Sequence, residues 1–131
     1  MIKSKESGQV LNAILTEGYE VSALQIFNLN RASAAEFLEV YNGVVTEFNA
    51  MVDELISGPA LVLEIRAEKA VASFRESAGP WDISFAKELF PSTIRARFGR
   101  NNVQNAVQCT DLEGDGVSEV GYFFDLLSSK C

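Results

Sequence analysis

The sequence predicts an α/β fold, because the spacing of its apolar residues switches between the helical and the strand period. Residues 8–17 carry apolar side chains at helical spacing, residues 19–27 alternate as a strand does, and residues 59–65 form a near-continuous apolar run. With 131 residues, 47% of them hydrophobic, the chain can bury one core of ordinary size. We therefore expect a single domain over residues 1–131.

The first half of the chain predicts a helix, a strand and further helices. The helix at 8–17 is expected to end at Gly18, since glycine is common just after a helix. The strand at 19–27 has at least one buried face. Ser33 and Glu36 have the spacing of a capping box before a second helix, and residues 44–55 make an amphipathic third helix.

The second half predicts two strands and four helical segments. The strands are expected at 59–65, which is apolar enough to be buried, and at 106–109. The helical segments are expected at residues 68–78, 82–90, 93–98 and 117–127. The first of these must stop at Gly79-Pro80, because proline cannot continue a helix.

Charge and composition argue against nucleic acid and membrane partners. The net charge is -7, yet residues 66–100 hold seven of the 11 basic residues and four acids, so that segment carries +3. No basic stripe is interleaved with aromatic residues, as nucleic-acid binding would favour. No apolar run approaches the ~20 residues that span a bilayer, and the first residues lack the apolar region of a secretory signal. Two cysteines, Cys109 and Cys131, fit free thiols in a reducing, cytoplasmic compartment.

One acidic turn resembles the first half of a calcium-binding loop. Asp111, Glu113 and Asp115 place oxygens at loop positions one, three and five, and Gly116 follows at position six. The pattern then fails, because position twelve is Tyr122 rather than the bidentate glutamate. We predict a solvated turn here and no metal site in the chain.

Four separate blocks carry a family resemblance that covers roughly residues 8–126. They are Ser57-Gly58-Pro59 with the run to Ile65, Phe74-Arg75-Glu76 with Gly79-Pro80, Pro91-Ser92-Thr93-Ile94-Arg95, and Asn105-Ala-Val-Gln108-Cys-Thr-Asp111 with Glu119. Together they resemble the nucleoside diphosphate kinases, and residues 27–59 are most similar to the divergent axonemal branch, nucleoside diphosphate kinase 7. The resemblance implies a ferredoxin-like βαββαβ fold of the α+β type, with an antiparallel sheet covered by helices.

The family's nucleophile is replaced in this chain. The resemblance implies phosphoryl transfer through a phosphohistidine, but Gln108 stands at that position and the chain contains no histidine. The amide nitrogen of glutamine has its lone pair delocalised into the carbonyl, so it cannot attack phosphate. Cys109 is the one neighbouring nucleophile, and in a strand at 106–109 it would face away from Gln108. We therefore expect a catalytically inactive domain.

Several other site residues of the family have counterparts, which imply a site for a Mg-nucleotide and no required cofactor. The phosphate-binding arginines match Arg75 and Arg95, and Glu119 matches the former support of the histidine. The remaining positions are the pocket tyrosine Tyr41, the base-stacking aromatic Phe48, the pocket asparagine Asn105 and the hydroxyl residue Thr110. Trp81 departs from the pattern, since it stands where a phosphate-binding threonine is usual.

The amino terminus departs most from the family. Family members begin with an apolar strand that lies inside the sheet, whereas Met1-Ile2-Lys3-Ser4 matches only the turn after it, and only with a deletion. We expect a truncated first strand and an open slot whose backbone groups need partners. A fragment, a short isoform and a domain completed by a partner's strand are all compatible with this expectation.

Two functional classes follow from the resemblance. The first is an inactive domain that serves as a structural or interaction component of ciliary axonemal doublet microtubules, as a monomer or an oligomer. The alternative is a nucleotide-binding regulator or residual nucleoside diphosphate kinase in which Arg75 and Arg95 still hold phosphate. Without a nucleotide to bind, the arginines should pair with protein carboxylates such as Glu119 or Glu76, because an unpaired buried charge is costly.

Overall fold

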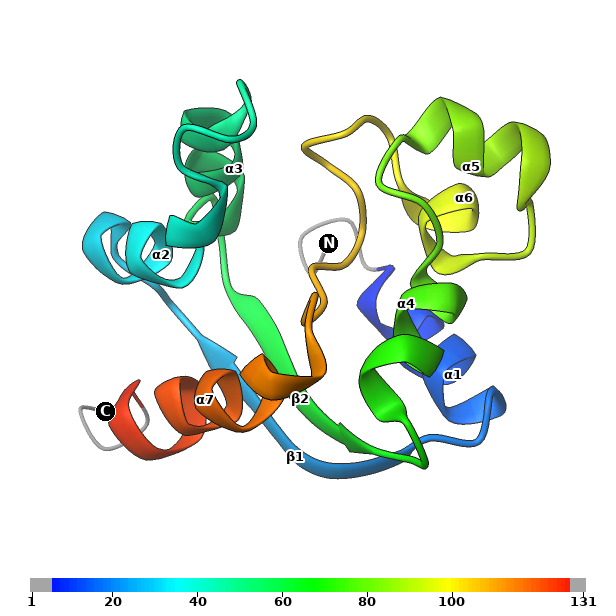
Figure 1. Cartoon of the computed structure of the whole chain (residues 1–131), viewed down its shortest axis with the longest axis horizontal. Helices are drawn as coiled ribbons and strands as arrows, with labels where there is room; N and C mark the ends of the chain where they lie inside the picture. The colour runs from blue at the N-terminus through cyan, green and yellow to red at the C-terminus, as the bar shows by residue number, and fades with distance from the viewer. Residues whose placement is uncertain (1–5, 128–131) are drawn as a thin grey trace.

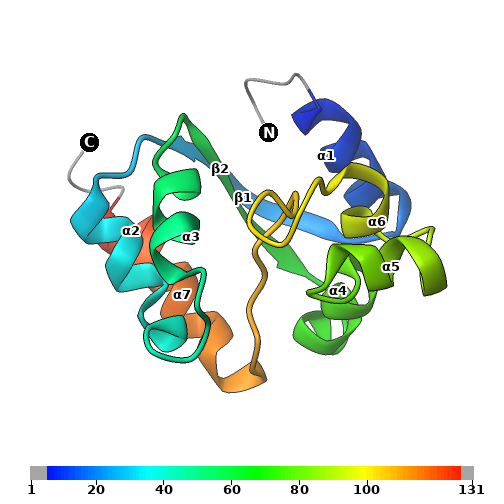
Figure 2. The same ribbon diagram turned by 90° about the horizontal axis from the view of Figure 1, so that it is seen from above.

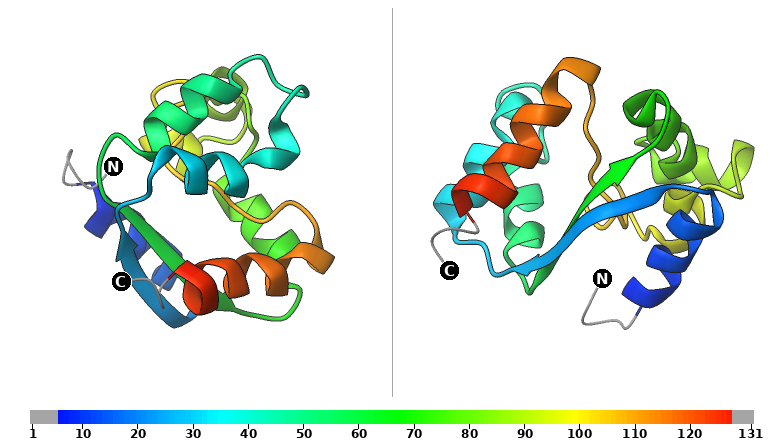
Figure 3. Two further views of the ribbon diagram at one scale, coloured as in Figure 1. Left: turned by 90° about the vertical axis from the view of Figure 1, so that its left-hand side faces the viewer. Right: turned by 90° about the horizontal axis from the view of Figure 1, so that it is seen from below.

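The computed structural model describes residues 6–127, which form two groups of helices joined by a two-stranded ribbon (Figure 1). One group contains α2, α3 and α7, and the other contains α1, α4, α5 and α6 (Figure 2). The strands β1 and β2 run from one group to the other (Figure 3). The α+β class with an antiparallel sheet is confirmed.

The first half of the chain folds largely as its periodicity predicts. It contains α1 (Ser7–Thr16), β1 (Glu20–Phe27), α2 (Arg31–Phe37), the 3₁₀ turn η1 (Glu39–Tyr41) and α3 (Phe48–Leu55). After α1 the chain turns at Gly18, whose φ of 93° favours glycine. The predicted capping box is wrong: Asn30 caps α2 by accepting from the Ser33 N–H at 2.8 Å, and Ser33 lies inside the helix.

The second strand, β2 (Ala60–Arg66), pairs with β1 in an antiparallel register from Glu20 opposite Arg66 to Phe27 opposite Ala60. An irregularity between Val21 and Ala23 interrupts the pairing. Among the described residues the sheet contains these two strands alone, so one edge of β2 has no strand beside it. The question of a truncated first strand falls on residues 1–5 and lies outside the described part of the chain.

The second half contains mainly short helices. They are α4 (Ala70–Ala78), α5 (Ile83–Leu89), α6 (Ile94–Phe98), the 3₁₀ turn η2 (Glu113–Asp115), α7 (Gly116–Gly121) and the π-helical turn η3 (Tyr122–Leu127). Asp82 and Thr93 cap α5 and α6 by accepting from backbone N–H groups. None of the described helices is both long enough and apolar enough to cross a bilayer.

The predicted strand at 106–109 is wrong. No strand lies beside this stretch to accept and donate backbone hydrogen bonds in the described residues, and Ala106 has a φ of 75°, outside the extended region. The pattern of apolar residues indicated burial correctly, since residues 106–109 are all partly buried. Burial alone does not form a strand without a neighbouring strand.

Buried side chains form three separate clusters instead of one continuous core. The first joins α1 to α6, the second joins α2 to α3, and the third joins the end of β1 to η3. The clusters consist of Val10, Ile14, Tyr19 and Ile94; Ala34, Leu38, Met51 and Val52; and Phe27, Phe123 and Leu127. Each group of helices therefore has its own core, with space between the groups along β2.

Candidate functional site

The segment 103–111 passes between the two groups of helices (Figure 1) and contains three of the predicted site residues, Asn105, Gln108 and Thr110. Its backbone turns sharply at Ala106, where the Val107 N–H donates to the Asn105 carbonyl at 3.0 Å. A three-residue turn around a residue with φ of 75° is strained when that residue has a Cβ. A strained backbone of this kind persists only where surrounding contacts stabilise it. Here Arg95 donates hydrogen bonds to the carbonyl of Val107, the residue after the turn.

Arg95 lies in α6 with 6% of its surface exposed, and its guanidinium donates three hydrogen bonds to backbone carbonyls. Its Nε and Nη2 donate to the Val107 carbonyl at 3.3 and 3.0 Å, and its Nη1 donates to the Gly79 carbonyl at 3.1 Å. Burial lowers the pKa of Arg95. This predicted phosphate ligand thus connects the strained turn to the end of α4.

Aromatic rings cover the other side of this arginine. The guanidinium carbon of Arg95 lies 5.6 Å from the centroid of the Trp81 ring, a cation–π contact. The ring of Tyr41 lies 5.6 Å from Trp81 at an interplanar angle of 37°. Where the family pattern has a threonine hydroxyl, this chain thus presents an indole face.

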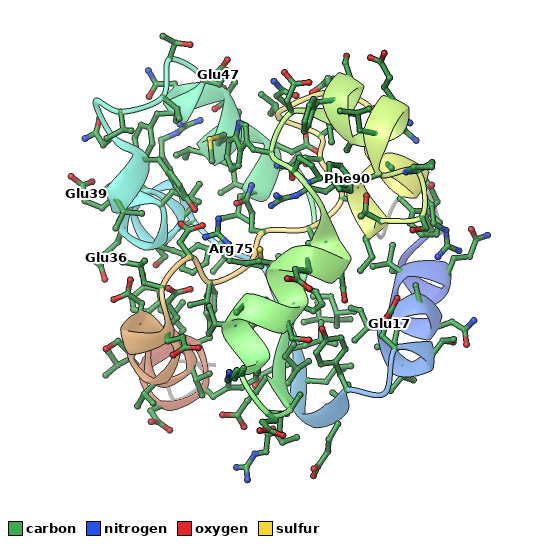
Figure 4. The ribbon with its side chains drawn as sticks, turned by 45° about the vertical axis from the view of Figure 1, so that its right-hand side comes forward. Glu17, Glu36, Glu39, Glu47, Arg75 and Phe90 are labelled. Carbon is green, nitrogen blue, oxygen red and sulfur yellow. The ribbon has the colours of Figure 1, made fainter. Side chains whose placement is uncertain are left out.

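Asp111 joins two of the predicted nucleotide-site residues, the pocket tyrosine Tyr41 and the phosphate-binding Arg75. The Tyr41 hydroxyl donates to one carboxylate oxygen of Asp111, and Arg75 Nη1 donates to the other at 3.0 Å and to the Asp111 carbonyl at 2.8 Å. Figure 4 shows Arg75 reaching from α4 toward this segment. Burial and the hydrogen bond to Asp111 raise the pKa of Tyr41.

This role of Asp111 was not predicted from the sequence. Without a nucleotide, the arginines were expected to pair with protein carboxylates such as Glu119 or Glu76, and the carboxylate that pairs with Arg75 is Asp111. The available signal was its place at the end of the Asn105–Asp111 motif, next to the predicted pocket residues. The hydrogen-bond acceptors of Arg95 are two backbone carbonyls rather than a carboxylate.

Gln108, which the resemblance implied stands in place of the nucleophile, has a buried side-chain oxygen without a hydrogen bond among the described residues. No donor among the described residues reaches its Oε1. An unsatisfied buried carbonyl of this kind costs about 1–3 kcal/mol. Among the described residues, no hydrogen bond to the side-chain oxygen explains the presence of Gln108.

Cys109 does not lie on the opposite side from Gln108 as the predicted strand implied. Without a strand at 106–109, the expectation that it faces away from Gln108 loses its basis, and both residues line one small pocket. Burial raises the pKa of the Cys109 thiol, although the charges of Arg95 and Arg75 oppose that shift. The thiol is therefore neutral near pH 7, and a neutral thiol is a poor nucleophile.

The small pocket beside Gln108 has a volume of about 240 Å³ and an acidic lining. It contains no lysine or arginine, and its carboxylates are Glu36, Asp111, Asp115 and Glu119. Burial raises the pKa of Glu119, which the hydrogen bond from Thr110 Oγ1 to Glu119 Oε1 at 3.0 Å opposes. An anion is disfavoured in this pocket, so a phosphate would have to approach from the arginine side.

Two predicted residues lie apart from this cluster. Asn105 is 3% exposed, and its Nδ2 donates to the Asn102 carbonyl at 3.4 Å. Phe48 begins α3 and packs against the α2–α3 cluster. The structure thus brings Tyr41, Arg75 and Arg95 around Asp111 and Cys109, while Asn105 and Phe48 support neighbouring loops and helices.

The fold and the site define a class of protein. It is an α+β domain with Arg75 of α4 and Arg95 of α6 beside the segment 103–111, which carries Gln108. The family model described as nucleoside diphosphate kinase matches residues 1–128. The chain belongs to the nucleoside diphosphate kinase family.

Known relatives support this membership. The chain is 51% identical to the nucleoside diphosphate kinase homolog 7 proteins of Rattus norvegicus and Mus musculus over 122 residues, or 93% of this chain and 31% of each relative. It therefore spans about a third of the length of those proteins. It is 30% identical to the nucleoside diphosphate kinase of Aquifex aeolicus over 89% of this chain and 82% of that one.

Solved structures agree with the fold. A crystal structure of the Aquifex aeolicus nucleoside diphosphate kinase matches with a TM-score of 0.88 and 28% identity, over 96% of this chain and 89% of that one. The apo enzyme from Encephalitozoon cuniculi matches with a TM-score of 0.84 at 19% identity, over 93% and 80% of the two chains, and supports the fold alone.

Proposed function

We propose that this chain is a nucleoside diphosphate kinase-like domain that does not transfer phosphate and acts as a structural or interaction component of axonemal doublet microtubules. The observation that carries the first half is Gln108, in a chain without histidine. An amide cannot form the phosphoenzyme on which this family's chemistry depends.

The neighbouring groups support the loss of catalysis. Cys109 is held as a neutral thiol by burial, so it does not replace the nucleophile. Arg75 is paired with Asp111, and Arg95 is committed to the carbonyls of Gly79 and Val107. The two arginines that would bind phosphate thus have partners within the protein. This pairing favours a structural role.

The axonemal half of the proposal rests on similarity. The 51% identity to the homolog 7 proteins agrees with the resemblance of residues 27–59 to the axonemal branch. Such a component would be cytoplasmic and enriched in cilia. Its acidic net charge of -7 means that contact with the acidic outer wall of a microtubule would need a local patch.

Incubation with ATP labelled at the γ-phosphate tests the loss of catalysis. We expect no acid-labile phosphoprotein, and a phosphoprotein that passes its label to a nucleoside diphosphate would overturn the proposal. The variant Gln108→His then locates the defect. Phosphoenzyme in that variant would confine the loss to the nucleophile, whereas a folded variant without phosphoenzyme would show that the surrounding site has also diverged.

Co-sedimentation with demembranated axonemes tests the structural role. We expect the chain to pellet with doublet microtubules in a saturable manner at physiological salt. The Aquifex aeolicus enzyme, which has the same fold, is the matched control and should remain in the supernatant. Equal partitioning of the two proteins would overturn the axonemal assignment and leave the loss of catalysis untouched.

A second candidate, nucleotide binding without transfer, is favoured by the convergence of Tyr41, Arg75 and Arg95. Trp81 is the single tryptophan and lies 5.6 Å from the Arg95 guanidinium, so its fluorescence can report on ligands there. In a titration with Mg-ADP, Arg75→Ala should weaken binding about tenfold, since it removes a charged hydrogen bond. Asp111→Asn should strengthen it by releasing Arg75. No change in fluorescence or heat with the folded protein would exclude this candidate.

A further inference from the structure

The guanidinium of Arg95 has donors to spare. An arginine side chain has five N–H groups, and Arg95 uses three of them, two on the Val107 carbonyl and one on the Gly79 carbonyl. One further N–H remains on Nη1 and one on Nη2, and neither has an acceptor among the described residues. These two atoms form an edge by which arginine holds a phosphate or carboxylate group in bidentate fashion.

The indole of Trp81 covers this guanidinium. The Arg95 guanidinium carbon lies 5.6 Å from the centroid of the Trp81 ring, and only 6% of the surface of Arg95 is exposed. A ring in this position stabilises the cation and keeps water away from it. An anion can therefore reach the remaining N–H groups only if a neighbouring side chain gives way, and Trp81 is the large side chain in contact.

Trp81 is fixed in place by its neighbours along the chain and in space. It follows Pro80, whose ring restricts the backbone, and precedes Asp82, whose carboxylate caps α5 by accepting from the Phe85 N–H at 3.0 Å. The indole packs against the α2–α3 cluster, and its ring lies 5.6 Å from that of Tyr41. These contacts favour a fixed cover over a mobile lid.

We infer that Trp81 is a specificity-determining residue that closes Arg95 to phosphate, so that Arg75 is the one of the two arginines through which an anion can bind. The Arg75 side chain is 48% exposed and is held by Asp111 at 3.0 Å. One open arginine suits a single phosphate or carboxylate group, whereas a nucleoside diphosphate needs cations along its length. The inference rests on the proposed loss of phosphate transfer and adds a second cause: Gln108 removes the nucleophile, and Trp81 removes a substrate contact.

Calorimetric titration with pyrophosphate, which has no base, tests this inference. We expect Trp81→Thr to bind pyrophosphate at least about tenfold more tightly than the parent, because the free N–H pair of Arg95 then adds charged hydrogen bonds. Trp81→Phe keeps an aromatic cover and should gain less than about threefold. Equal affinities of the parent and Trp81→Thr, with both folded by circular dichroism, would overturn the inference.

Two further variants locate the gain in affinity. In the Trp81→Thr background, Arg95→Lys should abolish it, because an ammonium group does not present a fork of donors. Arg97→Lys, at an exposed position of the same helix, should leave it intact. A gain that survives Arg95→Lys would place the anion elsewhere and overturn the inference.

A measurement on the parent needs no substitution. Trp81 is the single tryptophan, so acrylamide quenching reports on its exposure alone. Quenching should be unchanged by saturating pyrophosphate, and a rise would show that the indole moves aside, which would overturn the closure of Arg95. Phosphate labelling of the parent by ATP would instead overturn the proposed loss of transfer without changing these affinities, so the two proposals fail separately.

Discussion

The surroundings of Arg95 and the cavity along β2 lie on two sides of the segment 103–111. The two regions differ in how their polar groups are hydrogen-bonded. Around Arg95, the strained turn at Ala106, the end of α4 and the ring of Trp81 all contact one guanidinium. Along β2, a whole strand edge faces a cavity. The guanidinium of Arg95 is thus held by backbone carbonyls and an aromatic ring, whereas one edge of β2 has no strand beside it among the described residues.

This difference also explains why the chain has three small cores. The hydrogen bonds of Arg95 connect α4, α6 and segment 105–111, which all lie on one side of the cavity along β2. The α2–α3 cluster on the other side is joined to them mainly through Tyr41, Asp111 and Trp81. Substitutions that remove the hydrogen bonds of Arg95 should therefore lower the free energy of unfolding more than substitutions at the polar contacts of Asp111.

The largest effect is expected for Arg95→Ala. The substitution removes three hydrogen bonds from a charged donor and leaves the carbonyls of Gly79 and Val107 without it. We expect a loss of about 3 kcal/mol in the free energy of unfolding, measured by urea denaturation. Arg97→Ala, at an exposed position in the same helix, should stay within about 0.5 kcal/mol. Equal losses of stability in the two variants would show that the hydrogen bonds of Arg95 do not stabilise the contact between α4, α6 and segment 105–111.

A slightly smaller effect is expected for Gly79→Ala. Gly79 has a φ of 96°, and an added Cβ would lie 2.5 Å from Thr93 Oγ1, the side chain that caps α6. Strain and clash together should cost about 1–3 kcal/mol on thermal or urea unfolding. Gly114→Ala is the matched control, because nothing lies within 4 Å of its added Cβ. A neutral Gly79→Ala variant would mean that α6 can shift, and that Arg95 does not fix its position.

Sequence reasoning predicted the local elements well because their signals are local. Gly18 and Gly79-Pro80 end α1 and α4 as expected, and β2 coincides with the apolar run at 59–65. The prediction at 106–109 was wrong because a strand depends on a neighbour that periodicity cannot supply. The capping box was wrong because Asn30, three residues before Ser33, was the better placed acceptor.

The site was predicted in composition and only partly in geometry. The family motif identified Arg75, Arg95 and Tyr41, which the structure brings together. It gave no partner to Asp111, because pairing between Tyr41 and a residue 70 positions later is a tertiary contact. The orientation of Cys109 was inferred from a strand that does not form, so the error in one element carried over to the site.

A third prediction concerns the pH dependence of stability at Glu119. Burial raises the pKa of this carboxyl above its ordinary value of 4.5. The folded state therefore holds the proton more tightly, so the group's favourable contribution is complete below about pH 4.5 and is lost as the pH rises through the folded pKa. Glu119→Gln keeps the acceptor for Thr110 and removes the charge. It should be more stable than the parent at pH 7 by up to about 1 kcal/mol, a figure limited by partial solvent screening.

Chemical denaturation of both proteins between pH 4 and pH 8 would measure this difference. The stability advantage of Glu119→Gln should shrink as the pH falls. An advantage of Glu119→Gln that is constant with pH would mean that the amide improves packing, and that the acidic lining is not a source of strain.

The smallest effect is expected for the pair of Arg75 and Asp111, at the point where the two compared regions meet. The side chains are 48% and 40% exposed, so their 3.0 Å ion pair is screened by water. A double-mutant cycle with Arg75→Ala and Asp111→Ala should give a coupling energy of about 0.5 kcal/mol, falling with added salt. The exposed pair Arg31–Asp53 provides a comparison without a tyrosine at its carboxylate. A coupling well above 1 kcal/mol would show that Asp111 fixes Arg75 firmly. In that case the arginine would not be available to phosphate, which would count against nucleotide binding and favour the structural role.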